Sequence, residues 1–273
     1  MIFLCTQGGI GNQLFQIAYA LKLSKEYKKK IYLLNDHINP IGGDERSREL
    51  EFLGFNIEEK NLFLPKYKWF RSKYIKYFKP SIAYIDDSNY KNNFLNDKYL
   101  LLDGFFQDPQ ELENIRNYLK KIIQDKAKDH NFRIKDRRTV AVHIRRGDYV
   151  SNRHASNSLG FVGLDYYLSS IDLIKQKIND PKIEIFTDDV KWVKKNLNHI
   201  GPFNIISERN MGSNKEFLYF FSYQNFIIAN SSFSWWAPWL NYSNIDGLVI
   251  CPKLWFSNKQ KSKLNMIESW TKI

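Results

Sequence analysis

The sequence is most informative in the run Val140-Ala141-Val142-His143-Ile144-Arg145-Arg146-Gly147-Asp148-Tyr149. Its first half is apolar and its second half is charged and broken by a glycine, which predicts a buried strand that opens into a loop. In open α/β sheets, ligands bind at the carboxyl ends of the strands. Arg145 and Arg146 carry planar charged groups suited to phosphate, and His143 shares a strand face with Arg145. A surface ion-pair cluster is the alternative, but the particular order of residues favours a phosphate site.

Two more polar clusters follow predicted strands in the same half of the chain. Thr187-Asp188-Asp189 follows the strand 183–186, and Asn230-Ser231-Ser232-Phe233-Ser234 follows the strand 226–229. Parallel strands end at one edge of their sheet, so the three clusters are expected to line one crevice. Arginines match a diphosphate, serines at a helix start add donors for it, and a carboxylate suits guanine or a ribose diol. Helix capping is the alternative for each aspartate or serine taken alone.

The chain begins with a strand, a glycine turn and a helix. The apolar strand 2–5 leads into Gln7-Gly8-Gly9-Ile10-Gly11-Asn12-Gln13, and an amphipathic helix follows. The turn lacks the Gly-x-Gly-x-x-Gly spacing of dinucleotide folds. Two interpretations stay open: close approach of a ligand, with the amides of Asn12 and Gln13 at the helix start, or a tight turn and nothing more.

The alternation of strands and helices predicts an α/β fold with mainly parallel sheets. Asp108-Pro109 predicts the cap and first residue of a helix. The charged stretch 126–138 has little to bury and is predicted to link two domains, 1–135 and 136–273. Further strands are expected at 31–34, 99–106, 205–206 and 248–251, the last closing its sheet, and further helices at 165–178, around 193, at 215–223, from 230 toward 240 and in the polar tail.

The formal charge of +12 over 273 residues indicates an anionic neighbour, which is nucleic acid, a membrane surface or a phosphorylated substrate. Scattered basic residues without an RNA-binding signature argue against nucleic acid. The basic and aromatic segment 66–79 is interpreted as an ordinary packed helix, with a helix that lies on anionic lipid as the alternative.

Metal and disulfide chemistry find no support in the sequence. Cys5 and Cys251 cannot form a disulfide framework, no Cys/His spacing matches zinc, and no Asp-x-Asp occurs. Without a metal, arginines would have to neutralise the charge on a leaving diphosphate. The apolar run 2–5 is too short for a signal peptide and no run is long enough to span a membrane, so a cytoplasmic protein is expected, with peripheral contact at the inner membrane face left open.

The motifs Gly8-Gly9-Ile10-Gly11-Asn12-Gln13, His143-x-Arg145-Arg146-Gly147-Asp148-Tyr149, Phe186-Thr187-Asp188-Asp189 and Asn230-Ser231-Ser232-Phe233-Ser234-Trp235-Trp236 occur in this order along the chain. Together they resemble glycosyltransferase family 11, the bacterial α-1,2-fucosyltransferases. The resemblance implies a GT-B-like architecture of two Rossmann-like halves facing a cleft, with the acceptor side in the N-terminal domain and GDP-fucose in the C-terminal domain. It also implies inverting, metal-independent transfer of L-fucose from GDP-fucose to the 2-hydroxyl of a terminal galactoside, in O-antigen, lipopolysaccharide or capsule biosynthesis, with no cofactor.

The resemblance also implies roles for single residues. Arg145 would hold the β-phosphate and stabilise departing GDP. From its own chemistry, Asp148 can brace a guanidinium or accept from a sugar hydroxyl, and it is the second catalytic candidate. His143 and one of Asp188 or Asp189 would contact the nucleoside, and Asn12 would reach the donor from the first half. Further donor contacts are expected from Arg146, Thr187, Asn230, Ser231, Ser232 and Phe233, and acceptor contacts from Gln13, Asp44, Glu45 and Gln107.

Three points stay open. No carboxylate among Asp44, Glu45 and Asp148 stands out as a base, and an oxocarbenium-like transition state with a weak or absent base fits a fucosyl donor. Asp108-Pro109-Gln110 replaces a Ser-Glu-Lys-like sequence of the family, which leaves the acceptor undefined, and Glu216 stands where aspartate is common. The alternatives are another GDP-sugar, another fucosyl linkage, a non-catalytic sugar-binding module and a nucleic-acid-binding protein; a lipid-linked acceptor is also considered.

Overall fold

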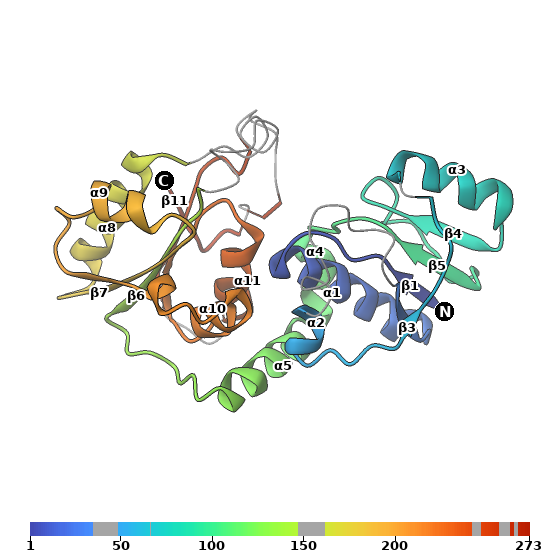
Figure 1. Cartoon of the computed structure of the whole chain (residues 1–273), viewed down its shortest axis with the longest axis horizontal. Coiled ribbons are helices and arrows are strands. Elements are labelled where there is room, and N and C mark those ends of the chain that lie inside the picture. Colours follow the sequence, from blue (N-terminus) through green and yellow to red (C-terminus); the bar gives the residue numbers. More distant parts are fainter. Residues whose placement is uncertain (35–48, 66, 147–161, 242–246, 257–262, 265–266) are drawn as a thin grey trace. The chain divides into compact units, whose positions relative to one another are not determined.

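The computed structural model describes residues 1–34, 49–65, 67–146, 162–241, 247–256, 263–264 and 267–273. The chain divides into two compact units, Met1–Ile122 and Ile123–Ile273, and each unit is built on one sheet (Figure 1). Every pairing among the described strands is parallel. The predicted α/β class with parallel sheets is therefore confirmed, while the predicted boundary at residues 135 and 136 stays a prediction.

The first unit holds a five-stranded sheet in the order β3-β2-β1-β5-β4. Its central strands are short apolar runs, which suits strands that are buried on both faces. The strands are β1 (Ile2–Leu4), β2 (Ile31–Leu34), β3 (Glu59–Lys60), β4 (Ile82–Ile85) and β5 (Tyr99–Leu102), and the helices are α1 (Ile10–Tyr27), α2 (Glu49–Phe52), α3 (Lys68–Phe78), α4 (Pro109–Leu112), the 3-10 turn η1 (Glu113–Ile115) and α5 (Arg116–Asp129), which runs into the second unit.

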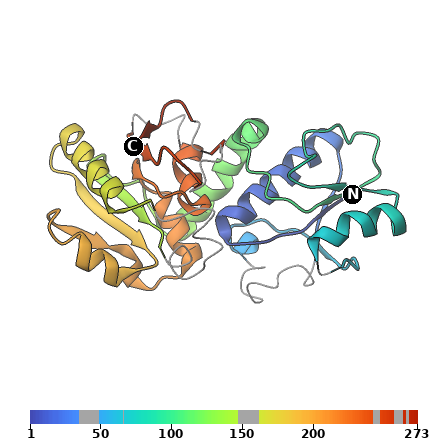
Figure 2. The same ribbon diagram turned by 90° about the horizontal axis from the view of Figure 1, so that it is seen from above.

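Helices cover both faces of the first sheet. α3 packs Ile75 against Cys5 and Leu101, which point to one face. Side chains alternate along a strand, so Leu4 and Leu102, both fully buried, point to the other face. α1 lies on that side (Figure 2).

The second unit holds a six-stranded sheet in the order β11-β10-β9-β6-β7-β8. Its central strand β6 is buried at every residue, in keeping with its apolar sequence. The strands are β6 (Thr139–Ile144), β7 (Lys182–Thr187), β8 (Phe203–Ile205), β9 (Asn225–Ile227), β10 (Val249–Cys251) and β11 (Thr271–Lys272), and the helices are α8 (Leu164–Lys177), α9 (Val190–Asn196), the 3-10 turn η2 (Ile206–Arg209), α10 (Ser213–Phe220) and α11 (Ser232–Asn241).

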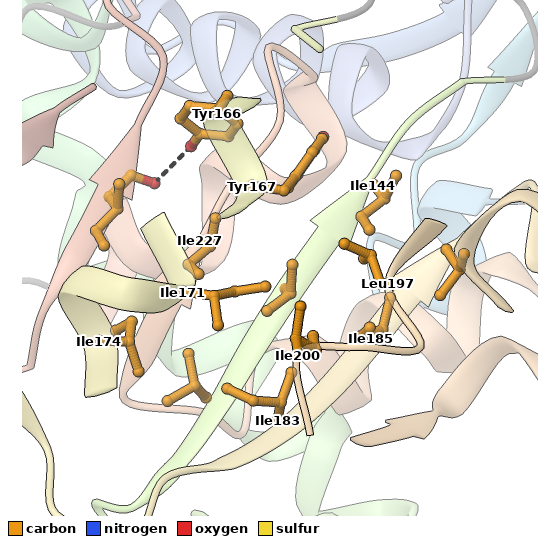
Figure 3. Close-up of a cluster of buried hydrophobic side chains, with 14 of the residues drawn as sticks. Ile144, Tyr166, Tyr167, Ile171, Ile174, Ile183, Ile185, Leu197, Ile200 and Ile227 are labelled. Carbon is orange, nitrogen blue, oxygen red and sulfur yellow. Dashed lines mark hydrogen bonds between the residues drawn. The ribbon is translucent and has the colours of Figure 1, made fainter. Parts of the chain in front are cut away.

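The two faces of the second sheet differ in character. On one face, Ile144 and Ile185 pack against Ile171 of α8 and Leu197 of α9 in an aliphatic core (Figure 3). Tyr166 of α8 satisfies its hydroxyl by donating to the carbonyl of Ile250 at 3.2 Å. On the opposite face, the rings of His143, Phe186 and Phe226 pack against Phe220 of α10 and Phe233 of α11.

The structure corrects three local predictions. The chain's last element is the strand β11, not a helix, so the strand 249–251 does not close the sheet. The predicted link 126–138 begins with helix, because Ala127 continues the buried stripe of Leu119 and Ile123 along α5. The strand predicted at 99–106 ends at Leu102, and Phe106 takes a left-handed backbone with φ of 54°.

Within the described residues, no helix has both the length and the apolar character needed to cross a membrane.

Candidate functional site

The strand order places the arginine motif at a reversal of the second sheet. From β6 the chain moves outward through β7 and β8, and then returns to the other side of β6 with β9. The loops after β6 and β9 therefore leave in opposite directions. In open parallel sheets this switch point, at the carboxyl ends of the strands, is where ligands bind.

Arg145 and Arg146 are paired with the aspartates that follow β7. The register Ile144↔Thr187 sets the two strand ends side by side. Arg145 Nη1 lies 2.9 Å from Asp188 Oδ2, and Arg146 Nε donates to Asp189 Oδ2 at 3.2 Å. The predicted clusters after β6 and β7 thus meet in one ion-pair group.

The two arginines are held differently. Arg146 also donates its backbone N–H to Asp188 Oδ1 at 2.8 Å, and its guanidinium lies 4.4 Å from the ring centroid of Trp192. Its side chain is therefore fixed by an ion pair and a cation–π contact. The side chain of Arg145 is 34 % exposed, about twice as much as that of Arg146. Arg145 is the arginine of the pair that is more open to a ligand.

His143 connects β6 with the start of α11. Its ring stacks on Phe233 with centroids 5.0 Å apart and planes 26° apart. Burial, reinforced by the charge of Arg145, lowers the pKa of His143 to about 3, so the imidazole is neutral at physiological pH. Its Nδ1 is buried and has no hydrogen-bond partner within the described part of the chain. A neutral imidazole with an unused polar atom can offer one hydrogen bond to a bound group.

The third predicted cluster lies at the other side of the switch point. Ser231, Ser232 and Phe233 are half-buried at the beginning of α11, where backbone N–H groups carry partial positive charge. Asn230 is buried, and its Nδ2 donates to the carbonyl of Trp255 at 3.1 Å. Asn230 therefore fastens the chain that follows β10 to this edge of the sheet.

A hydrogen-bonded chain supports the segment after β7. Asp189 caps α9 by accepting from the N–H of Trp192 at 3.0 Å, and its own N–H donates to Thr187 Oγ1 at 3.0 Å. Ser207 Oγ accepts from the N–H of Thr187 at 3.0 Å and donates to Glu216 at 3.2 Å. Burial raises the pKa of Glu216. The capping alternative for Asp189 is thus realised together with its ion pair.

Sequence reasoning missed Trp192 and Ser207. The position of Trp192, three residues after an aspartate cap, was available as a signal. Nothing local marks Ser207, because its partner Thr187 lies 20 residues earlier and meets it only through the pairing of β7 with β8.

The first sheet has a switch point of its own, between β1 and β5. Gln107 Nε2 donates to Asn12 Oδ1 at 3.0 Å, which joins the residues after the two strands. Gln13 is fully buried, and its Nε2 donates to the carbonyl of Gly8 at 3.0 Å. Gly8 has a φ of 77°, and a Cβ there would lie 2.5 Å from Asn12 Nδ2. The glycine turn therefore makes room for the amide of Asn12.

Asp108 is a fixed structural residue. It is fully buried, and it caps α4 by accepting from the N–H of Gln110 at 3.3 Å. The hydroxyl of Tyr90 donates to its Oδ2 at 2.8 Å, and Lys91 Nζ lies 2.9 Å from the same oxygen. The predicted cap is confirmed, and the oxygens of this carboxylate bind groups of the same unit.

Asp44, Glu45 and Asp148 lie outside the described residues. Within the part of the chain that is described, no group of three or more His, Cys, Asp or Glu side chains could hold a metal ion.

Comparison with known proteins gives two relatives that align along almost the full chain. The O-antigen biosynthesis glycosyltransferase WbnK of Escherichia coli is 29 % identical, with all of both chains covered. An alpha-1,2-colitosyltransferase of Escherichia coli is 30 % identical, with 97 % of this chain and 96 % of the relative covered. Among solved structures, ADP-heptose lps heptosyltransferase II of E. coli superposes with a TM-score of 0.48 at 8 % identity, over 92 % of this chain and 84 % of that chain.

The family profile described as Glycosyl transferase family 11 matches residues 4–273, which takes in both sheets and both switch points. The resemblance drawn from the four sequence motifs is thereby confirmed. The chain belongs to glycosyl transferase family 11 and is a glycosyltransferase.

Proposed function

We propose that this glycosyltransferase transfers L-fucose from GDP-fucose to the 2-hydroxyl of a terminal galactoside, with inversion and without a metal ion. The observation that carries the proposal is the pair Arg145 and Arg146 at the switch point of the second sheet. Two fixed positive charges at such an edge suit the diphosphate of a nucleotide sugar.

The proposed chemistry has two coupled parts. The bond between fucose C1 and the β-phosphate oxygen breaks, and GDP departs with the electron pair. The acceptor oxygen attacks C1 from the opposite side, which inverts the configuration at C1, and its proton passes to a carboxylate base or to water. Negative charge grows on the departing β-phosphate, and the guanidinium of Arg145 stabilises that charge. Asp188, at 2.9 Å, orients this guanidinium before the donor binds.

The nucleoside half of the donor is proposed to bind beside β6, β7 and α11. Thr187, Asp188, Asp189 and His143 offer polar atoms there, and Phe233 stacks its ring on the imidazole. The first turn of α11, with Ser231 and Ser232, adds donors for phosphate. Asn12 is proposed to contact the donor from the first unit. Arg146 and Asn230 are proposed to complete the donor set.

The acceptor is proposed to be a galactose-containing glycan that contacts the first unit. Gln13 and Gln107 lie at the switch point of that unit, with Gln107 bonded to Asn12. The relative WbnK acts in O-antigen biosynthesis, which supports a surface polysaccharide as the product. We propose a cytoplasmic enzyme in peripheral contact with the membrane, where a lipid-linked acceptor would be found. Asp44, Glu45 and Asp148 are the carboxylates to test as acceptor contacts or base.

A second candidate donor follows from the relative described as an alpha-1,2-colitosyltransferase. Colitose is fucose without its 3-hydroxyl, so the two donors share the diphosphate and the base. A site that hydrogen-bonds the 3-hydroxyl rejects the donor that lacks it. Transfer measured with each donor separately therefore identifies the donor.

The decisive experiment incubates the enzyme and EDTA with either GDP-fucose or GDP-colitose and a panel of β-galactosides. Release of GDP and the linkage of the product are measured. Fucose on the galactose 2-hydroxyl in the presence of EDTA supports the whole proposal. Transfer from GDP-colitose but not from GDP-fucose would make GDP-colitose the donor. Transfer from neither, with no binding of GDP, refutes the arginine site.

A further inference from the structure

α3 exposes large aromatic side chains on its outer side. Trp69 is 73 % exposed, and Tyr77 and Phe78 are each 71 % exposed. An exposed aromatic surface of this kind marks an interaction site in a folded protein. We define the α3 patch as Phe63, Tyr67, Trp69, Phe70, Tyr77 and Phe78, all of which are exposed.

Rings of this region contact one another in two groups. The centroids of Trp69 and Phe70 lie 5.7 Å apart. Tyr74 stacks on Phe78 at 5.2 Å and meets Phe63 edge-on at 5.9 Å. The α3 patch therefore holds one ring pair at the start of the helix and one group that joins Phe63, before the helix, to Phe78 at its end.

The inner side of α3 is firmly attached to its unit. Arg71 is buried, and its Nη1 lies 3.0 Å from Asp103 Oδ2. Its Nε donates to the carbonyl of Pro65 at 2.8 Å, and Tyr84 donates to Asp103 at 2.7 Å. Ile75 is buried beside them. The aromatic side of the helix is therefore presented in a fixed orientation.

The patch lies in a segment of one charge sign. No acidic residue occurs between Asn61 and Ile85, and lysines stand at positions 66, 68, 73, 76 and 79. Lys73 and Lys76 are exposed on α3 among the aromatic side chains. Trp and Tyr favour the level of lipid headgroups, and lysines at that level are attracted to anionic lipid.

We propose that the α3 patch is a docking surface for a bilayer that contains anionic phospholipid, on which α3 lies with its aromatic side in the headgroup region. Like charges on two copies would repel, which disfavours self-association through the same surface. The rings pack on each other's edges and faces, which disfavours their use as stacking platforms for nucleic-acid bases. The inference rests on the proposed function in one respect: a lipid-linked acceptor gives the enzyme a reason to bind a membrane.

The test is co-sedimentation of the full chain with vesicles of phosphatidylcholine, with and without phosphatidylglycerol. Two double variants probe the patch: Lys73→Glu with Lys76→Glu, and Trp69→Ser with Tyr77→Ser. The control is Lys25→Glu with Lys177→Glu, two exposed lysines in the last turns of α1 and α8, which changes the net charge equally. Transfer to a soluble β-galactoside is measured for every protein.

Binding by the wild type only to phosphatidylglycerol vesicles is expected. Each patch variant should lose on the order of tenfold or more in partitioning, while the control stays within about twofold of wild type. Equal binding by the lysine variant and the control overturns the inference. The inference is also overturned if the wild type does not bind vesicles but captures oligonucleotides or dimerises, and the patch variants abolish that binding. If the wild type binds vesicles but transfers no fucose to the soluble β-galactoside, the proposed function is refuted and the proposed docking surface is retained.

Discussion

Arg145 and Arg146 are held by different contacts although they are neighbours in sequence. Arg146 is fixed by Asp189, by Trp192 and through its own backbone N–H, whereas Arg145 is the more exposed of the pair. The role proposed for Arg145, to stabilise the charge that grows on a departing phosphate, is favoured by a guanidinium that is oriented without being fully enclosed. Asp188 supplies that orientation to Arg145 while it also anchors the backbone of Arg146.

Arg145→Lys is expected to lower kcat roughly 100-fold or more, because a single ammonium cannot reproduce the planar fork that meets a departing phosphate. Donor consumption under saturating GDP-fucose is the measurement. The matched control is Arg138→Lys, an exposed arginine just before the same strand, which should keep near-normal turnover. Near-normal turnover by Arg145→Lys would remove this residue from the chemical step.

His143 makes stability depend on pH. Its pKa is about 3 in the folded chain and about 6.5 when unfolded, so the unfolded chain binds the extra proton between these values. Stability from this group is complete above pH 6.5 and is lost as the pH falls toward 3, at about 1.4 kcal/mol per pH unit. Urea unfolding of wild type and His143→Phe at about pH 7 and about pH 5 measures the difference.

The variant is expected to show a flatter pH dependence than wild type, since phenylalanine keeps a ring against Phe233 and cannot take up a proton. His199→Gln, a histidine substitution at an exposed position, is the matched control. Identical slopes for wild type and His143→Phe would mean that the buried imidazole does not titrate in this range.

At the scale of elements, the turn between β5 and α4 is a constrained part of the first unit. Phe106 is fully buried with a left-handed backbone and stacks on Tyr19 at 4.5 Å. The carboxylate of Asp87 accepts from the N–H groups of Phe105 and Phe106 at 2.9 and 2.7 Å. A Cβ on Gly104 would lie 2.8 Å from the ring of Phe106 and 3.0 Å from the backbone nitrogen of Asp87.

Gly104→Ala is therefore expected to destabilise the chain by about 1–3 kcal/mol, because neither the stacked ring nor the backbone can yield easily. Gly9→Ala is the matched control, since a Cβ at that position meets nothing within 4 Å. Chemical denaturation of both variants gives the comparison. Equal stability of the two variants would show that the turn relaxes freely. In that case the packing of the turn would not be what positions Gln107.

The same scale shows what the sequence could predict. Apolar runs such as 31–34 and 140–144 matched buried central strands, and Asp108-Pro109 matched a helix start, because each depends on its own residues. The edge strands Glu59–Lys60 and Thr271–Lys272 are polar pairs without periodicity, and they exist only through their neighbours Leu33 and Ile250. Local patterns cannot reveal such strands.

The candidate site also has parts that the sequence could predict and parts that it could not. The polar clusters could be placed at strand ends, since the order of strands and helices already implies a parallel sheet. The pairing of Arg145 with Asp188 could not be derived, because it depends on the register between β6 and β7. The link from Thr187 through Ser207 to Glu216 needs three separate elements to meet. Long-range packing supplies these contacts.

For the molecule as a whole, the two units repeat one organisation. Each has a parallel sheet whose strand order reverses beside its first strand, β1 or β6. Polar side chains follow the two strands that flank each reversal: Asn12 and Gln107 after β1 and β5, and Arg145 and Ser231 after β6 and β9. The charges differ. The second unit presents arginines at its reversal, and the first presents the amides of Asn12 and Gln107. This contrast supports a diphosphate on the second unit and an uncharged sugar on the first.

GDP alone is therefore expected to protect backbone amides mainly in the second unit. At about 100 times its Kd, a ligand stabilises the state that binds it by about 2.7 kcal/mol. Hydrogen exchange with and without GDP should show slower exchange at 144–146, 187–189 and 231–235, where the arginines, the aspartates and the start of α11 lie. β4 of the first unit provides the internal reference, because it belongs to the other sheet.

Protection at Gly8–Gln13 in the same experiment would support the donor contact proposed for Asn12, and its absence would assign Asn12 to the acceptor alone, where it already holds Gln107. Arg145→Lys should reduce the protection at 187–189 as well as at 144–146, because Asp188 joins the two segments. Protection confined to the first unit would reverse the roles of the two sheets. That outcome would refute the arginine site even in a protein that transfers fucose.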